Sequence, residues 1–153
     1  MATTIWDPAV RKEIIDRFAR LTPDRKPDWG KMNAVQMVRQ CTVALDMFTG
    51  AAKVAPKAGP LRNPVLRYLI IHVLPWPHGA PTAPELITSE FQGNWDKETA
   101  ALRRSLDAIV ARGENGSFEE HPAFGRLSEK SLGVLVAKHL NHHLRQFGMK
   151  RAG

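Results

Sequence analysis

The chain has 153 residues, 43% apolar and 24% charged, and its formal net charge is +7 with the histidines neutral. This length and composition are typical of one folded domain and exclude a largely disordered chain. No apolar run approaches the roughly 20 residues that cross a bilayer, and no signal-peptide pattern opens the chain. The single cysteine, Cys41, has no internal partner for a disulfide. We therefore expect one cytoplasmic domain over residues 1–153, without a membrane partner.

The positive charge, with a pI of about 10.0, raises nucleic acid or another polyanion as a partner. The lysines and arginines are scattered, however, and no aromatic residues alternate with them in the way that stacks bases. We therefore do not expect nucleic acid to be the partner, and a polyanion-binding domain is a third hypothesis, weaker than the two functions given at the end of this section.

The first predicted helix has a clear start. Asp7 is a good N-cap and Pro8 suits the first helical position. Apolar residues then recur at helical spacing as far as Phe18. Residues 21–29 contain two prolines and predict a loop.

The second predicted helix starts at Asn33, which forms a capping-box pattern with Gln36 three residues later. Its end is marked by Gly50, although the alanines beyond this glycine also allow an extension to about Val54. Prolines at both ends of residues 56–60 then break the helix.

A short apolar helix is predicted at residues 65–73, because Asn63 and Pro64 precede it as N-cap and first helical residue. Four prolines follow within residues 75–84. They predict a stiff, largely extended crossing, because proline fixes the backbone and donates no hydrogen bond.

A third long helix is expected to start at Asn94 or Thr88 and to end at Gly113. Residues 114–127 predict a loop, and residues 128–147 predict the last helix. No convincing strand alternation or hairpin turn occurs. We therefore predict an all-α fold, a four-helix bundle with one short extra helix, in which the long proline-rich connection acts as a crossover.

The last predicted helix holds three of the six histidines. On a helical wheel, His139 and His143 differ by about 40° and lie in the middle of the apolar face, one turn apart. His142 lies at the edge of that face, about 60° to the other side of His139. The wheel therefore predicts an inward pair of imidazoles with a third imidazole beside it.

Two imidazoles spaced i and i+4 can bind one divalent metal ion. Without a metal they must stay neutral and find hydrogen-bond partners, because an unsatisfied buried group costs about 1–3 kcal/mol. Such pairs also occur in protein cores, where side chains or water satisfy them. The spacing alone leaves both interpretations open.

Gln40 is a polar residue in the apolar stripe of the second helix, so we expect it to point inward. It is a candidate third ligand, although a buried amide that holds two helices in register explains it as well. Cys41 fits a small packed residue, His72 fits a structural one, and the loop residues His78 and His121 are weaker candidates for the site.

Five segments together resemble one family, and the last of them reads His-Leu-Asn-His-His-Leu-Arg-Gln-Phe-Gly; they are residues 29–37, 74–77, 83–85, 121–128 and 139–148. Their combination and order resemble the uncharacterised branch of the DinB/YfiT-like superfamily, a domain of unknown function. The resemblance extends from about Trp29 to Gly148.

This resemblance implies an up-down-down-up four-helix bundle, often a homodimer. Members of the superfamily typically bind one divalent metal through a histidine of the second helix and two of the last. The last-helix pair corresponds to His139 and His143, whereas the second-helix histidine falls on Gln40, a weaker ligand. Some members are thiol-dependent transferases or isomerases.

Two principal functions are expected. The first is a DinB-like, metal-dependent enzyme, a hydrolase or a thiol-dependent transferase, with a degenerate His-His-Gln site. His139, His143 and Gln40 would bind Zn, Ni or Fe there, and a low-molecular-weight thiol would be a partner. The second is a metal-free bundle that kept the scaffold for small-molecule binding or for an interaction.

Overall fold

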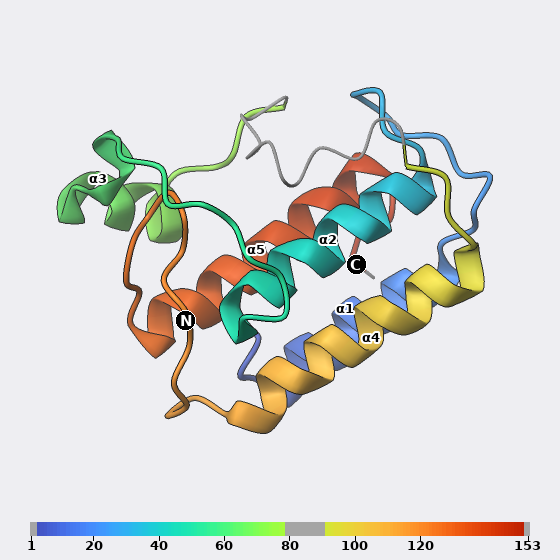
Figure 1. Ribbon diagram of the computed structural model, residues 1–153. Helices are drawn as coiled ribbons and strands as arrows, with labels where there is room; N and C mark the ends of the chain where they lie inside the picture. The colour runs from blue at the N-terminus through green and yellow to red at the C-terminus, as the bar shows by residue number, and fades with distance from the viewer. Residues whose placement is uncertain (1–2, 79–90, 152–153) are drawn as a thin grey trace.

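The structure is a computed structural model that describes residues 3–78 and 91–151 (Figure 1). Within these residues the chain is helical and forms no strand, only an isolated bridge between His121 and Gly125. The helices are α1 (Pro8–Arg20), α2 (Ala34–Thr49), α3 (Pro64–Tyr68), α4 (Trp95–Arg112) and α5 (Glu129–Gln146), with a 3₁₀ turn η1 (Pro60–Arg62) and a π-helical turn η2 (Leu69–Val73). None of the described helices is both long and apolar enough to cross a bilayer.

The predicted helix starts are confirmed by side-chain caps. Asp7 accepts a hydrogen bond from the backbone of Ala9 at 2.8 Å, and Asn33 and Gln36 form the reciprocal capping box. Asn94 and Ser128 cap α4 and α5. The alternative start at Thr88 lies outside the described residues, as do the last two prolines of the crossing, Pro81 and Pro84.

The extension of α2 to Val54 is wrong. The helix ends at Thr49, because Gly50 adopts a left-handed conformation with φ of 84°. Arg112 of α4 then donates to the carbonyl of Thr49 at 2.9 Å, which satisfies a free carbonyl at this helix end.

The short apolar helix is not one regular α-helix. Residues 64–68 are α-helical, and η2 then widens into a π-helical turn in which the amide of Leu74 donates to the carbonyl of Leu69. Both Lys138 and the indole of Trp76 donate to the carbonyl of Ile70. These donors from outside the helix explain why the regular α-helical pattern stops here.

The core lies among the four longer helices, whose axes run in similar directions in Figure 1. Helix α2 packs against both α4 and α5, α1 packs against α5, and η2 also contacts α5. Helix α5 therefore lies between α1, α2 and η2. Its position explains why its polar residues His142, His143 and Gln146 are buried along with its apolar ones.

Gly133 lets the N-terminal segment lie against α5. The amide of Ile5 donates to the carbonyl of Gly133 at 3.0 Å, and the indole of Trp6 donates to the carbonyl of Glu129 at 2.8 Å. A Cβ atom at position 133 would lie 2.5 Å from the hydroxyl of Thr4. This close approach explains a glycine in the middle of a helix, where it otherwise costs stability.

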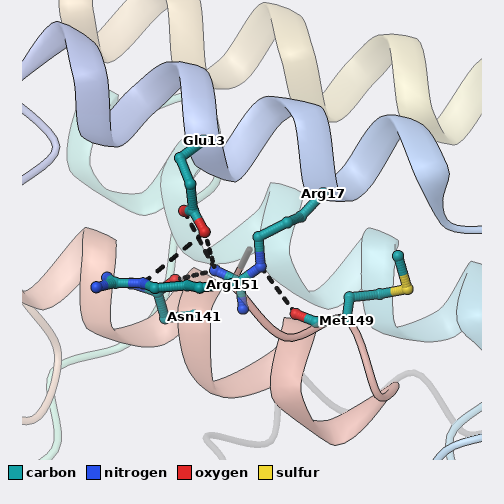
Figure 2. A network of polar contacts seen from close by, with 5 residues as sticks. All are labelled: Glu13, Arg17, Asn141, Met149 and Arg151. Atoms are coloured by element: carbon teal, nitrogen blue, oxygen red, sulfur yellow. Dashed lines mark hydrogen bonds and ion pairs between the residues drawn. The ribbon is translucent and has the colours of Figure 1, made fainter. Parts of the chain in front are cut away.

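A buried arginine joins α1 to α5 and to the C-terminal segment (Figure 2). Arg17 is only 1% exposed, and its guanidinium donates to Asn141 at 2.5 Å, to the carbonyl of Met149 at 2.8 Å and to Glu13 at 3.1 Å. Arg151 lies 3.8 Å from the same Glu13 carboxylate. The buried charge is therefore paired and hydrogen-bonded, as burial of a charge requires.

We predict that Arg17→Met lowers the free energy of unfolding by about 2–4 kcal/mol, because Asn141 and the Met149 carbonyl lose their charged donor inside the protein. Urea unfolding at constant m-value measures the change. Lys12→Met is the matched control on the same helix, since the Lys12–Asp16 pair is 78% and 55% exposed and should contribute less than about 1 kcal/mol. Equal effects of the two substitutions would contradict this account.

Candidate functional site

His139 and His143 converge on α5, as the helical wheel predicts. Their Nε2 atoms are 3.1 Å apart, and their rings meet nearly edge to face with centroids 4.7 Å apart. The side chain of His143 is buried, with 7% exposed, whereas His139 is only partly buried.

Gln146 fixes the protonation of this pair. Its amide nitrogen donates to the carbonyl of Trp29 at 3.0 Å, so its oxygen faces Nδ1 of His143 at 2.8 Å. A carbonyl oxygen only accepts, which means that Nδ1 of His143 must carry the proton. Nε2 of neutral His143 then presents a lone pair, and His139 donates the proton of the Nε2–Nε2 hydrogen bond.

The loop before α2 is held against the end of α5 by several bonds. The amide of Asp28 donates to the carbonyl of Gln146 at 2.7 Å, and Arg25 donates to the carbonyl of Phe147 at 3.0 Å. Gly30 turns the loop with φ of 82°, and a Cβ atom there would lie 2.8 Å from the Gln146 amide nitrogen. Glycine thus allows both the turn and the close approach of the amide.

Aromatic rings surround the third histidine of α5. His142 is 8% exposed, and its ring centroid lies 5.8 Å from that of Trp29 and 5.7 Å from that of Trp76. Trp76 also lies 6.1 Å from His139. The predicted position of His142 beside the pair is confirmed, and two tryptophans from distant parts of the sequence join it.

Burial keeps these imidazoles neutral. It lowers the pKa of His139 well below its usual value, and the charges of the neighbouring histidines lower it further. It lowers the pKa of His142 to about 4. Burial also lowers the pKa of His143, although the hydrogen bond to Gln146 raises it in part. At neutral pH the imidazoles are therefore uncharged, as metal ligands must be.

The spacing of the pair fits two ligands of one metal ion. Imidazole nitrogens at about 2.0–2.1 Å from a tetrahedral zinc ion lie about 3.3 Å from each other, close to the observed 3.1 Å. In residues 3–78 and 91–151, however, no group of three or more histidine, cysteine, aspartate or glutamate side chains is arranged to hold a metal. The structure thus brings together two imidazole donors.

Gln40, the predicted third ligand, is buried with 4% exposed on α2, one of the helices that pack against α5. Its inward orientation is consistent with the sequence pattern. Its role as a metal donor stays a prediction.

The remaining histidines have other partners. Nδ1 of His121 accepts hydrogen bonds from the amides of Ala123 and Phe124, so its Nε2 carries the proton and offers no lone pair to a metal. His72 pairs with the hydroxyl of Ser131 at 2.9 Å, and exposed His78 stacks on Trp29. His121 and His72 are therefore structural in their described positions.

Cys41 is fully buried, and burial raises the pKa of its thiol far above the usual value. The thiol is therefore protonated and shielded, which excludes it as a nucleophile in this conformation.

Sequence reasoning missed the residues that orient the pair. Gln146 lies three residues after His143, so the two share a helix face, and this spacing was the available signal. The Trp29 carbonyl gave no signal, because a backbone atom acquires its role only when the loop is placed.

We predict that acid destabilises the protein partly through His121, because burial, assisted by Arg62, lowers its pKa to about 4. Between that pH and about 6.5 the unfolded chain binds a proton that the folded protein does not, so stability falls as pH is lowered, by about 1.4 kcal/mol per pH unit for each such histidine. His121→Asn keeps an acceptor for the two amides and should reduce this slope by about that amount. Exposed His78→Asn is the control, and an equal slope in both variants would contradict the prediction.

Residues 11–150 match a family that is described as protein of unknown function (DUF1569). Comparisons with curated proteins and with solved structures each found no match. The family match covers the loop at Trp29, the His121–Gly125 turn and all of α5, so it includes every residue of the site described above. The chain belongs to the DUF1569 family of proteins of unknown function.

Proposed function

We propose that His139 and His143 bind a divalent metal ion, Zn, Ni or Fe, and that the protein is a metal-dependent enzyme of the hydrolase or thiol-dependent transferase type. The observation that carries this proposal is the Nε2–Nε2 approach of 3.1 Å, combined with the Gln146 bond that leaves a lone pair on Nε2 of His143. A ligand histidine whose other nitrogen donates to a fixed acceptor is typical of metal sites.

Each residue has a distinct part in this proposal. His143 binds through Nε2 in the tautomer that Gln146 imposes, and His139 binds through Nε2 after its proton moves to Nδ1. Gln40 supplies a weak carbonyl oxygen from α2 in place of the superfamily's histidine. A metal bound there with an open coordination position would lower the pKa of a bound water or thiol.

A thiol substrate would have to come from outside the protein, because Cys41 is buried and protonated. The proposal therefore includes a low-molecular-weight thiol as the partner of a transferase.

The proposal includes a relationship to the DinB-like superfamily. We infer an up-down-down-up four-helix bundle formed by α1, α2, α4 and α5, a homodimeric assembly and a cytoplasmic location. The packing of α2 on α4 and α5, and of α1 on α5, supports the bundle.

The second candidate is a metal-free domain that binds a small molecule or a partner. One observation favours it: a separation of 3.1 Å also suits a hydrogen bond, so the two histidines satisfy each other without a metal. Metal analysis separates the two candidates.

We predict that untagged protein binds about one equivalent of zinc, and that this metal raises the melting temperature because it binds only the folded state. His139→Ala/His143→Ala should abolish binding, whereas His72→Ala, the control outside the pair, should keep it. Elemental analysis and thermal unfolding with and without chelator measure both effects. Less than a tenth of an equivalent after soaking in zinc, with an unchanged melting temperature, would establish the metal-free alternative, and Gln40→His should then create zinc affinity.

We predict that Gln146→Leu weakens zinc binding by about 10–100-fold, as the loss of the partner of a ligand histidine usually does. The substitution removes the acceptor that holds the proton on Nδ1 of His143, and it leaves the Trp29 carbonyl without its donor. Gln146→Glu restores the acceptor and should recover part of the affinity. Competition with a chelating dye measures the affinity. An affinity of Gln146→Leu equal to that of the wild type would refute the assigned tautomer control.

A further inference from the structure

Trp29 forms a fixed aromatic platform beside the histidine pair. The loop is held on both sides of its indole, by the Asp28 amide that donates to Gln146 and by the Trp29 carbonyl that accepts from Gln146. The indole itself is only partly buried. A rigid, accessible aromatic face is the usual means by which proteins bind a flat ring.

His78 already occupies one face of this platform. Its ring is parallel to the indole within 4°, with centroids 3.6 Å apart, which is the geometry of a stacked ligand. The imidazole is exposed, and among the described residues no hydrogen bond holds it. A larger ring that stacks better can compete with this imidazole for the face of the indole.

A second wall extends from this platform toward the pair. Trp76 is fixed by the bond from its indole to the Ile70 carbonyl, and it lies next to both His142 and His139. Together Trp29, His142 and Trp76 form a row of rings that ends at His139.

Arg145 supplies the positive charge of this surface. It is exposed, and it follows His142 by three residues on α5, so the two side chains are neighbours on the surface of the helix. Lys138, which lies over the Trp76 ring, is occupied, because its ammonium donates to the carbonyls of Ile70, Ile71 and Leu74. Arg145 is therefore a cation of α5 that can bind an anionic group beside His142.

We propose that a planar aromatic ring with an anionic substituent binds on Trp29 in place of His78, with its anionic group at Arg145. This inference deepens the proposed function, on which it rests in one respect: the bound ring would be the substrate of the site at His139 and His143. The ring-binding surface itself needs no metal.

The test uses 2-naphthoate with full-length, chelator-treated protein, so that no metal can bind the carboxylate. Indole N–H signals in nitrogen-edited NMR spectra follow the titration. We expect saturable shifts of the Trp29 and Trp76 signals. The His78→Ala variant should bind 2-naphthoate about three- to tenfold more tightly, because the imidazole that competes for the indole face is gone. The Trp29→Leu variant should bind it at least about tenfold more weakly, because the aromatic face itself is gone. His72→Ala, which removes an imidazole stacked on Tyr68, is the matched control and should bind like the wild type.

Arg145→Gln should weaken the binding of 2-naphthoate by about three- to tenfold. It should leave the binding of the neutral 2-naphthylmethanol unchanged, because only the carboxylate interacts with the positive charge. Exposed Arg104→Gln on α4 is its control. No saturable shift, or an affinity of His78→Ala that is equal to or lower than that of the wild type, would overturn the proposal. Zinc titration of the same variants separates the two proposals: ring binding without zinc binding would refute only the metal site, and zinc binding without ring binding would refute only this surface.

Discussion

The side-chain amide of Gln146 is the interaction on which the site depends. One end of the amide donates to the carbonyl of Trp29, and the other accepts from His143. Because the carbonyl has no proton to give, the amide can have only one orientation, and the imidazole can have only one tautomer. A backbone atom before α2 thus decides which nitrogen of a histidine on α5 offers a lone pair.

The fold provides this arrangement through the position of α5. Helix α5 packs against α1, α2 and η2, so several of its polar side chains are buried and need partners. Asn141 is satisfied by Arg17 of α1, and Gln146 by the loop before α2. His139 and His143 face each other instead of a partner on another helix. The hydrogen bond between their Nε2 atoms is the contact that an incoming metal ion can replace, while Nδ1 of His143 stays bonded to Gln146.

Local chemistry explains what could be predicted from the sequence. The caps at Asp7, Asn33 and Ser128 need only residues within three positions, and the inward direction of His139 and His143 follows from helical periodicity alone. Three features could not be predicted: the hydrogen bond from Gln146 to the Trp29 carbonyl, the π-helical turn opposite Lys138 and the tautomer of His121. Each depends on a partner whose position only the fold determines. The burial of Gln40 follows from the apolar pattern of α2, whereas its role as a metal donor does not follow from that pattern.

The tautomer of His143 tests the central claim most directly. Long-range proton–nitrogen NMR of the histidine rings in metal-free protein distinguishes a proton on Nδ1 from one on Nε2. We predict that His143 carries its proton on Nδ1, that His139 carries its proton on Nε2, and that zinc moves the His139 proton to Nδ1. A metal-free His143 with its proton on Nε2 would contradict this prediction, because the lone pair that the proposed metal site needs would then face Gln146.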